Sequence, residues 1–218
     1  DDGVDILIDA AGFVAGSRLL TLARRPAPLQ VHFPMMSTTG MSAVDYCIGD
    51  LRLLPPGAET AFTERLWRLP CALLYRPLAD LPPVSPPPAA ANGWVTFGSF
   101  NRAPKIGPEV LAAWAAVLRR VPGSRLLIKA AGISRSTVDE YRQAIAAAGL
   151  DPARVEFRGR TESDAAHFQH YGDIDIALDT FPHCGVITTL DALSMGVPVV
   201  TRAGARPLER YGADRKST

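Results

Sequence analysis

The sequence predicts an α/β protein built on doubly wound parallel sheets. Two observations lead to this class. Short apolar runs alternate with amphipathic helical patterns from Trp94 onward, and the first thirty or so positions already read as strand, helix and strand. The length of 218 residues allows one large domain or two small ones. We therefore expect parallel sheets whose strands are joined by helices.

The N-terminal part contains one strand, helix, strand unit. Asp5–Ala10 is a short apolar run that ends at Gly12, which is typical of a buried strand followed by a loop. A brief helix follows Gly16 and stops at Arg25–Pro28, where proline interrupts it. Leu29–Phe33 is apolar enough to be the next strand.

A proline-rich stretch separates the two parts. Pro55–Pro88 has the composition of a crossover linker that runs over the surface, which argues against its lying in a sheet. We therefore expect an N-terminal α/β part over 1–80, a proline-rich linker over 81–92, and a C-terminal α/β part over 93–218.

The C-terminal part alternates regularly between strands and helices. Val110, Trp114 and Leu118 lie on one face of a predicted helix, Ser136 is expected to cap the next one, and Gly149 to close it. The expected elements are strand Gly93–Phe100, helix Pro108–Val121, strand Arg125–Lys129, helix Ser136–Ala148, strand Val155–Phe157, helix Ser163–Tyr171, strand Ile174–Leu178, helix Thr188–Met195 and a strand from Pro198 to Thr201.

Composition excludes several classes of protein. Lys and Arg total 23 against 22 for Asp and Glu, so no global field favours nucleic acid. Cys47, Cys71 and Cys184 are too scattered for a disulfide framework, which suggests a reducing, cytoplasmic setting. No apolar run approaches the roughly 20 residues of a membrane span. The sequence also lacks the motifs of dinucleotide oxidoreductases, P-loop enzymes and α/β hydrolases.

Two loop segments are candidates for an anion site. In Leu178–Thr201, a strand ends in a loop of small and polar residues, and Thr188, Thr189 and Asp191 open the following helix. Open α/β sheets bind phosphates at such positions, at the carboxyl ends of their strands. The alternative is an ordinary capped helix after a tight turn.

The second candidate segment, Phe97–Ile106, brings Asn101, Arg102 and Lys105 together at a helix start. Positive side chains oppose the helix dipole there unless an anion is present. The alternative is an exposed, solvated lysine.

Metal ligation has little support. His167 and His170 lie on one predicted helix without an obvious third ligand. Asp173 and Asp175 form a short acidic motif similar to the one with which some sugar transferases hold a divalent cation. Such a tripeptide is weak evidence, so a metal-dependent transferase stays an alternative.

Five blocks in order resemble the catalytic region of the O-GlcNAc transferase family, including bacterial members that follow tetratricopeptide repeats. The blocks are DILIDAAGFVAGSR, RPAPLQ, STTGMSAVDYCIGD, FGSFNRAPKIGPEVLAAWAAVLRRVPGSRLLIK and LDTFPHCGVITTLDALSMGVPVVT. The resemblance implies a GT-B fold of two Rossmann-like domains, with the N-terminal one (1–80) incomplete here and the C-terminal, UDP-binding one (93–218) truncated at its end. It also implies inverting transfer of N-acetylglucosamine, or another hexose, from a UDP-sugar such as UDP-GlcNAc to protein Ser or Thr hydroxyls, without a metal or other cofactor.

The same resemblance implies roles for individual residues. Lys105 matches the lysine that supports the leaving diphosphate, with Asn101 and Arg102 in the adjoining loop. The other matches are His167 beside the nucleotide, Glu162 with its backbone near the uracil, Thr188 and Thr189 in the phosphate loop, Asp191 near the ribose, and Gly40 at the end of a sugar-side loop. A lysine and a helix N-terminus can together stabilise the charge that builds up on UDP.

Departures from the family pattern leave a second function open. Val186 and Ile187 stand where relatives carry a histidine or glycine and then a threonine, and the sugar-side loop carries Pro34, Met35, Met36 and Ser37 in place of a glycine- and proline-rich sequence. The alternative is a catalytically inactive remnant that binds a nucleotide sugar or a protein partner.

Overall fold

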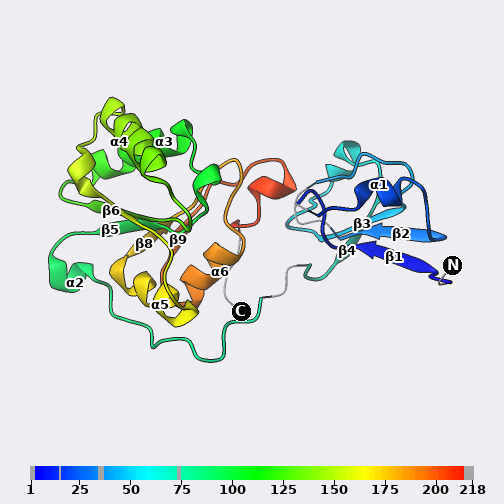
Figure 1. The fold of residues 1–218 in the computed structure, drawn as a ribbon, viewed down its shortest axis with the longest axis horizontal. Coiled ribbons are helices and arrows are strands. Elements are labelled where there is room, and N and C mark those ends of the chain that lie inside the picture. Colours follow the sequence, from blue (N-terminus) through cyan, green and yellow to red (C-terminus); the bar gives the residue numbers. More distant parts are fainter. Residues whose placement is uncertain (1–2, 15, 34–36, 73–74, 214–218) are drawn as a thin grey trace. The chain divides into compact units, whose positions relative to one another are not determined.

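The chain folds into two compact units. A computed structural model describes residues 3–14, 16–33, 37–72 and 75–213. The first unit comprises the described residues up to 72 together with 204–213, and the second comprises residues 75–203. Figure 1 shows the elements of both units. None of the described helices combines the length and the apolar character that a membrane crossing requires.

The first unit is built on a four-stranded parallel sheet. Its strands β1 (Ile6–Asp9), β2 (Leu29–His32), β3 (Tyr46–Asp50) and β4 (Arg65–Leu69) follow one another in that order across the sheet. Helix α1 (Leu19–Leu22) joins β1 to β2, and the 3₁₀ turn η1 (Ala58–Ala61) lies between β3 and β4. All three strand pairs are parallel, as the expected fold class requires.

Two of these strands were not expected from the sequence. The interpretation of Pro55–Pro88 as a surface linker is wrong for β4, which pairs with β3 from Arg65 to Leu69. Strand β4 lies at the edge of the sheet and contains two arginines and the half-exposed Trp67. Its sequence therefore lacks the continuous apolar pattern of a buried strand. In β3, Gly49 makes room for Leu54, whose Cδ1 would lie 2.2 Å from a Cβ at that position.

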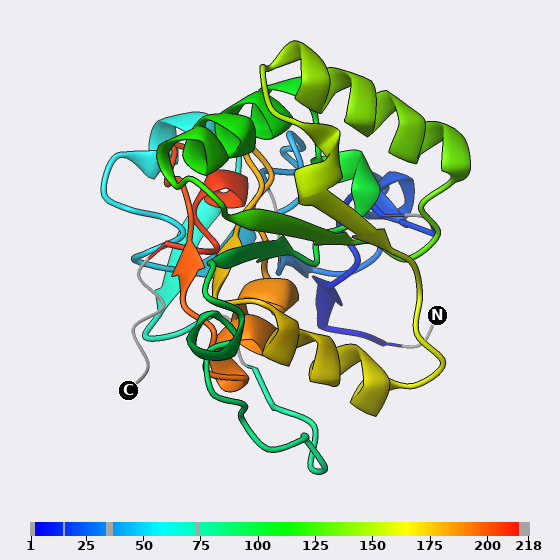
Figure 2. The ribbon, with the colours of Figure 1, turned by 90° about the vertical axis from the view of Figure 1, so that its left-hand side faces the viewer.

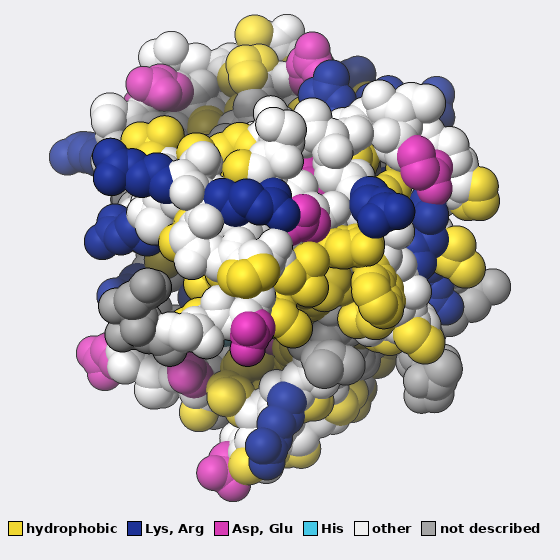
Figure 3. Space-filling model, turned by 90° about the vertical axis from the view of Figure 1, so that its right-hand side faces the viewer, with side chains coloured by type: hydrophobic (Ala, Val, Ile, Leu, Met, Phe, Trp, Pro, Cys, Tyr) yellow, Lys and Arg dark blue, Asp and Glu magenta, His cyan; other side chains and the backbone are white. Residues whose placement is uncertain are grey.

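Apolar side chains lie exposed in the first unit. Ile6 and Ile8 of the edge strand β1 are 54% and 56% exposed. Figure 3 shows hydrophobic side chains gathered on one face of the molecule. The other large exposed hydrophobic residues of this unit are Val4, Phe13, Val14, Leu20, Leu51 and Trp67.

The second unit is a doubly wound sheet of five parallel strands, as predicted. The strands are β5 (Thr96–Ser99), β6 (Arg125–Lys129), β7 (Val155–Arg158), β8 (Ile176–Leu178) and β9 (Val199–Val200), in the order β7-β6-β5-β8-β9. The chain runs outward from β5 to β7 and then returns to place β8 on the other side of β5. The switch point therefore lies between β5 and β8, where open α/β sheets bind ligands.

Helices cover both faces of this sheet (Figure 2). Leu126 and Ile128 of β6 join the hydrophobic core under α3 and α4, while Leu127 joins the core under α5 and α6. This alternation is expected of a strand covered on both faces. The helical elements are α2 (Ala89–Asn92), η2 (Ala103–Lys105), α3 (Pro108–Arg120), α4 (Arg135–Ala147), η3 (Pro152–Arg154), α5 (Asp164–Gln169), η4 (His170–Asp173), α6 (Ile187–Ser194) and η5 (Pro207–Glu209), the last belonging to the first unit.

Two helix starts differ in detail from the sequence prediction. Helix α4 is capped by Ser134, whose Oγ accepts from Thr137 N at 3.1 Å, whereas Ser136 was expected. Helix α3 begins at Pro108 with Glu109 in its first turn, so Lys105 precedes it in the 3₁₀ turn η2. Lys105 therefore lies outside the first turn of α3, and its position has to be explained by what its side chain contacts.

Candidate functional site

Polar side chains meet at the switch point between β5 and β8. The buried Asn101 follows β5, and its Nδ2 lies 3.4 Å from Oδ1 of Asp179, the residue directly after β8. Thr188 of α6 donates through Oγ1 to Asn101 Oδ1 at 3.2 Å. Asn101 thus ties three elements together, and its amide is occupied by these bonds.

Asp179 organises the loop between β8 and α6. Its Oδ1 accepts from the backbone N–H groups of Thr180 and Gly185 at 2.8 and 2.6 Å, and its Oδ2 accepts from Thr201 Oγ1 at 2.7 Å. Sequence reasoning missed this residue. The available signal was an aspartate directly after a buried strand, at the edge where a parallel sheet places its functional loops.

The N-terminus of α6 is open toward this loop. Val186 precedes the helix and makes no side-chain cap bond, so the capped-helix alternative does not describe it. A Cβ on Gly185 would lie 2.6 Å from Thr188 Oγ1 and 2.8 Å from Thr189 Oγ1, so only glycine fits under the two hydroxyls. Helix N–H groups without a capping side chain form a favourable site for an anion.

Lys105 reaches the same loop from η2. Its Nζ donates to the backbone carbonyl of Cys184 at 2.9 Å. Burial lowers the pKa of Lys105, while Asp179 acts in the opposite direction. The pKa of His183 is lowered by burial and by the positive charges of Lys105 and Arg102. Arg102 itself is exposed, beside a groove of about 600 Å³ that also includes Tyr141. Positive charge therefore gathers at this loop.

Asp191, the expected ribose acid, lies one turn further along α6. It is buried, and Tyr75 Oη donates to its Oδ1 at 2.7 Å. Burial raises the pKa of Asp191, and the Tyr75 bond partly counters this rise. Tyr75 was not among the residues singled out in the sequence. A ligand hydroxyl that binds this carboxylate has to share it with Tyr75 or displace Tyr75.

His167 and Glu162 lie beyond the carboxyl ends of β6 and β7. His167, on α5, packs its half-buried ring against Phe100 with ring centres 5.8 Å apart, and its Nδ1 lies 2.8 Å from Lys129 Nζ. Burial and Lys129 lower the pKa of His167 to about 4. Glu162 is exposed in the loop before α5.

The loop that contains Gly40, which we expect to lie beside the sugar, belongs to the first unit and is anchored by a buried glutamate. Gly40 has a φ of +72°, which glycine adopts without strain. Glu64 accepts from Thr38 Oγ1 at 2.6 Å and from Thr39 N at 2.7 Å, and also from Thr39 Oγ1. Residues 34–36, and with them Pro34, Met35 and Met36, lie outside the described part of the chain.

We expect Glu64→Gln to destabilise the first unit by about 1–3 kcal/mol, because an amide NH₂ would face hydroxyl and N–H donors. Burial raises the pKa of Glu64, but bonds from Thr38 and Thr39 outweigh it and lower this pKa below 4.5. The carboxylate therefore stabilises the fold above that pH and loses its effect as pH falls further. Urea unfolding should show a difference in the free energy of unfolding between Glu64→Gln and the wild type at neutral pH, and a smaller difference in acid. Asp5→Asn, at an exposed position, is the control and should show no such difference. A constant difference across that range would contradict this assignment.

The acidic and histidine candidates for a metal have other partners. Asp173 pairs with Arg158 and with His170, whose Nδ1 lies 3.0 Å from Asp173 Oδ2. Asp175 accepts from the backbone N–H groups of Ala89 and Thr96 and so fixes the start of β5. Within the described ranges, no group of three or more His, Cys, Asp or Glu is arranged to hold a metal ion.

The model of the glycosyl transferase family 41 matches residues 1–75 and 89–213. The chain belongs to this family. The family 41 match spans both units, and the two parallel α/β sheets agree with the predicted fold class of two Rossmann-like domains.

Named relatives support the same assignment. A protein of Oryza sativa subsp. japonica, named as a probable UDP-N-acetylglucosamine–peptide N-acetylglucosaminyltransferase SPINDLY, is 42% identical over 94% of this chain and 22% of its own length. The protein SEC of Arabidopsis thaliana, which has the same enzyme name, is 31% identical over 96% of this chain and 22% of its own length. A mutant O-GlcNAc transferase of Thermobaculum terrenum superposes with a TM-score of 0.88 at 42% identity, covering 96% of this chain and 40% of that one. The chain thus spans about a quarter of the length of these curated relatives.

The structure brings most predicted site residues into one unit. Asn101, Lys105, Thr188 and Thr189 meet at the β8–α6 loop, and Arg102 adds charge beside it. Asp191 lies one turn further along α6. His167 lies at the neighbouring strand end. The further residues that the geometry adds are Asp179, His183, Lys129 and Tyr75 in the second unit, and Glu64 in the first.

Proposed function

We propose that this chain forms the nucleotide-sugar region of an inverting, metal-independent family 41 transferase. In this reaction N-acetylglucosamine passes from UDP-GlcNAc to Ser or Thr hydroxyls of a protein. The observation that carries the proposal is the position of Lys105, whose ammonium lies on the loop that leads into the uncapped N-terminus of α6. These groups supply positive charge where a leaving diphosphate needs it.

The chemistry matches this charge distribution. The bond between the anomeric carbon and the diphosphate oxygen breaks, and its electron pair leaves with UDP. Direct attack by the acceptor oxygen from the opposite side inverts the anomeric carbon, and the hydroxyl proton passes to a base. Preorganised donors that bind the charge developing on the leaving group lower the barrier. Lys105 and the α6 N–H groups take this part here without a bound cation.

A catalytically inactive nucleotide-sugar-binding or protein-interaction remnant is the second candidate. Two observations favour it. Val186 and Ile187 supply no hydroxyl or imidazole at the start of α6, and Tyr75 occupies the carboxylate of Asp191. Such a chain would bind UDP without transferring sugar.

The partners and the setting follow from the same proposal. We expect a UDP-sugar donor, a protein or peptide acceptor, and tetratricopeptide repeats upstream in the full-length protein. We also expect a cytoplasmic location, since the three cysteines of the sequence are too scattered for a disulfide framework. We also expect a bacterial source. The comparisons do not distinguish it from a plant source, because the rice relative and the Thermobaculum protein are both 42% identical to this chain.

A transfer assay with the full-length protein tests the proposal. UDP-GlcNAc and an acceptor protein are incubated with excess chelator, and mass spectrometry detects addition of one N-acetylhexosamine. We expect transfer at a rate that added Mg²⁺ does not change, and a β-linked product by NMR of its anomeric proton. UDP binding without transfer would favour the remnant, and transfer abolished by chelator would contradict the metal-independent mechanism.

A further inference from the structure

Lys129 is an unusually buried cation beside the candidate site. It ends β6, and only 4% of its surface is exposed, although lysine is rarely buried without a partner. Its Nζ lies 2.8 Å from His167 Nδ1 and 6.0 Å from the centre of the Phe100 ring. The ion pairs found among the described residues do not include Lys129. Its polar partner is therefore a histidine, not a carboxylate.

This contact fixes the protonation state of His167. Burial and the nearby Arg158 lower the pKa of Lys129. As an ammonium, Lys129 has three donors and no acceptor, so His167 Nδ1 accepts the bond. The imidazole is then neutral and carries its proton on Nε2. Positive charges on Arg158 and His170 near the pair disfavour a further proton, whereas Asp164 favours one. Burial is the largest cause, and together these effects lower the pKa of His167 to about 4.

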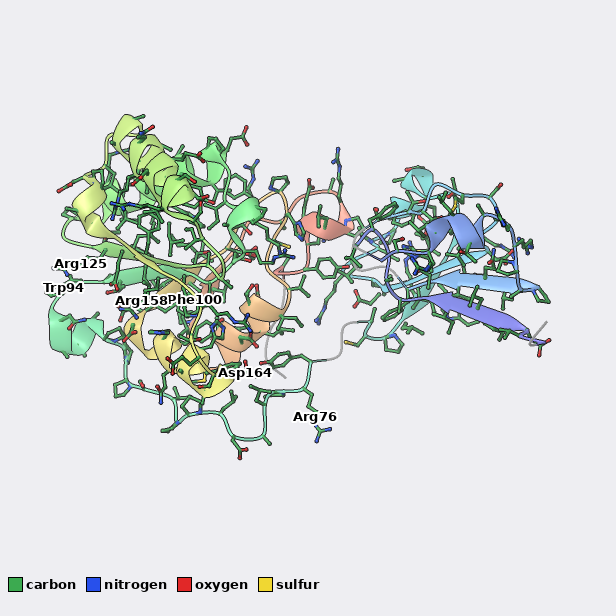
Figure 4. All side chains as sticks on the ribbon, viewed as in Figure 1. Arg76, Trp94, Phe100, Arg125, Arg158 and Asp164 are labelled. Atoms are coloured by element: carbon green, nitrogen blue, oxygen red, sulfur yellow. The ribbon has the colours of Figure 1, made fainter. Side chains whose placement is uncertain are left out.

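The orientation of the ring is fixed as well. Ring centres of Phe100, Phe168 and Tyr171 lie 5.8, 5.6 and 5.7 Å from that of His167. Figure 4 labels Phe100 and Arg158, both neighbours of Lys129, in the same region of the second unit. His167 is nevertheless only half-buried, so part of the ring remains accessible to a ligand.

We propose that Lys129 is a positioning residue that holds His167 as an Nε2–H donor toward an acceptor oxygen of the bound uridine nucleotide. The inference rests on the proposed function. Without Lys129, the imidazole can also adopt the Nδ1–H tautomer and takes up a proton more readily. In the Nδ1–H tautomer, Nε2 has a lone pair and no proton, so it cannot donate to the ligand oxygen. Lys129 thus acts on the ligand through His167 and not by direct contact.

Nitrogen NMR of the histidine rings, with His167 assigned by comparison with His167→Gln, tests this arrangement. In the wild-type chain we expect a neutral Nε2–H imidazole at neutral pH that stays neutral well below the ordinary histidine pKa of about 6.5. Lys129→Met keeps a long apolar side chain in the same space but removes the donor. We expect it to raise the His167 pKa toward the ordinary value, to populate both tautomers, and to weaken UDP binding about 5- to 20-fold.

Lys129→Arg provides the matched control, because it keeps a positive donor at this position. It should restore the Nε2–H tautomer and most of the UDP affinity, which a purely structural role for the aliphatic stem would not require. An Nδ1–H or protonated His167 in the wild type at neutral pH would overturn the inference, even if Lys129→Met does not fold. So would unchanged tautomer and UDP affinity in a folded Lys129→Met chain. If the wild type fails to bind UDP, the proposed function is contradicted, whereas the spectra still decide whether Lys129 sets the tautomer.

Discussion

Lys105→Met is expected to weaken UDP binding about 10- to 100-fold, because it removes a charge-assisted hydrogen bond to the diphosphate. Uridine, which has no phosphate, should bind the variant and the wild type equally. In the full-length protein, sugar transfer should fall by about 100-fold or more, since the same ammonium stabilises the charge that develops on the leaving group. Calorimetric titration with both ligands measures the first effect.

A matched control separates this local effect from a loss of overall positive charge. Arg120→Met removes one cation from the exposed end of α3 and should leave UDP affinity unchanged. The Lys105 assignment would be refuted by equal affinity for UDP in Lys105→Met and the wild type. An equal loss of UDP and uridine affinity would instead show that Lys105 maintains the fold of the loop.

Asp179→Asn is expected to destabilise the second unit by about 2–4 kcal/mol, because one of its oxygens is replaced by an NH₂ group facing donors. The carboxylate accepts from Gly185 N at 2.6 Å and Thr201 Oγ1 at 2.7 Å. UDP affinity should fall as well, since the β8–α6 loop loses its anchor. Urea unfolding measures the stability, with fluorescence of Trp114, whose Nε1 donates to Asp179 O at 3.3 Å, as the probe.

Thr201→Val is the graded control for Asp179. It removes a single donor and leaves the bonds to the loop backbone, so we expect a loss of about 1 kcal/mol and near-normal UDP affinity. If Asp179→Asn were no more destabilising than Thr201→Val, the loop would not depend on the carboxylate.

The second unit was predictable because its strands are covered on both faces. Runs such as Arg125–Lys129 and Ile174–Leu178 are nearly continuous in apolar residues, and Pro and Gly mark the ends of the helices. Strands β3 and β4 escaped prediction, since Gly49 and Asp50 end one and Arg65 and Arg68 interrupt the apolar residues of the other. Edge and half-exposed strands carry a weak apolar pattern, so tertiary pairing decides their conformation.

Some residues of the candidate site were likewise indicated by the sequence, and others were not. Lys105 and Thr188 were found because they stand in motifs at a strand-to-helix loop. Asp179 was missed although its place directly after a buried strand was a usable signal. Lys129 and Tyr75 were missed because their significance lies in contacts between residues far apart in sequence, such as the bond from Tyr75 to Asp191. A pattern within one segment contains no information on such contacts.

Calorimetric titration of UDP into the chain in excess chelator, repeated with Mg²⁺, tests the central claim most directly. A nucleotide diphosphate site built from Lys105 and the N-terminus of α6 predicts saturable binding of the same affinity in both buffers, at one site per chain. Binding that appears only with Mg²⁺, or none at all by a folded chain, would contradict a metal-free nucleotide site in the second unit.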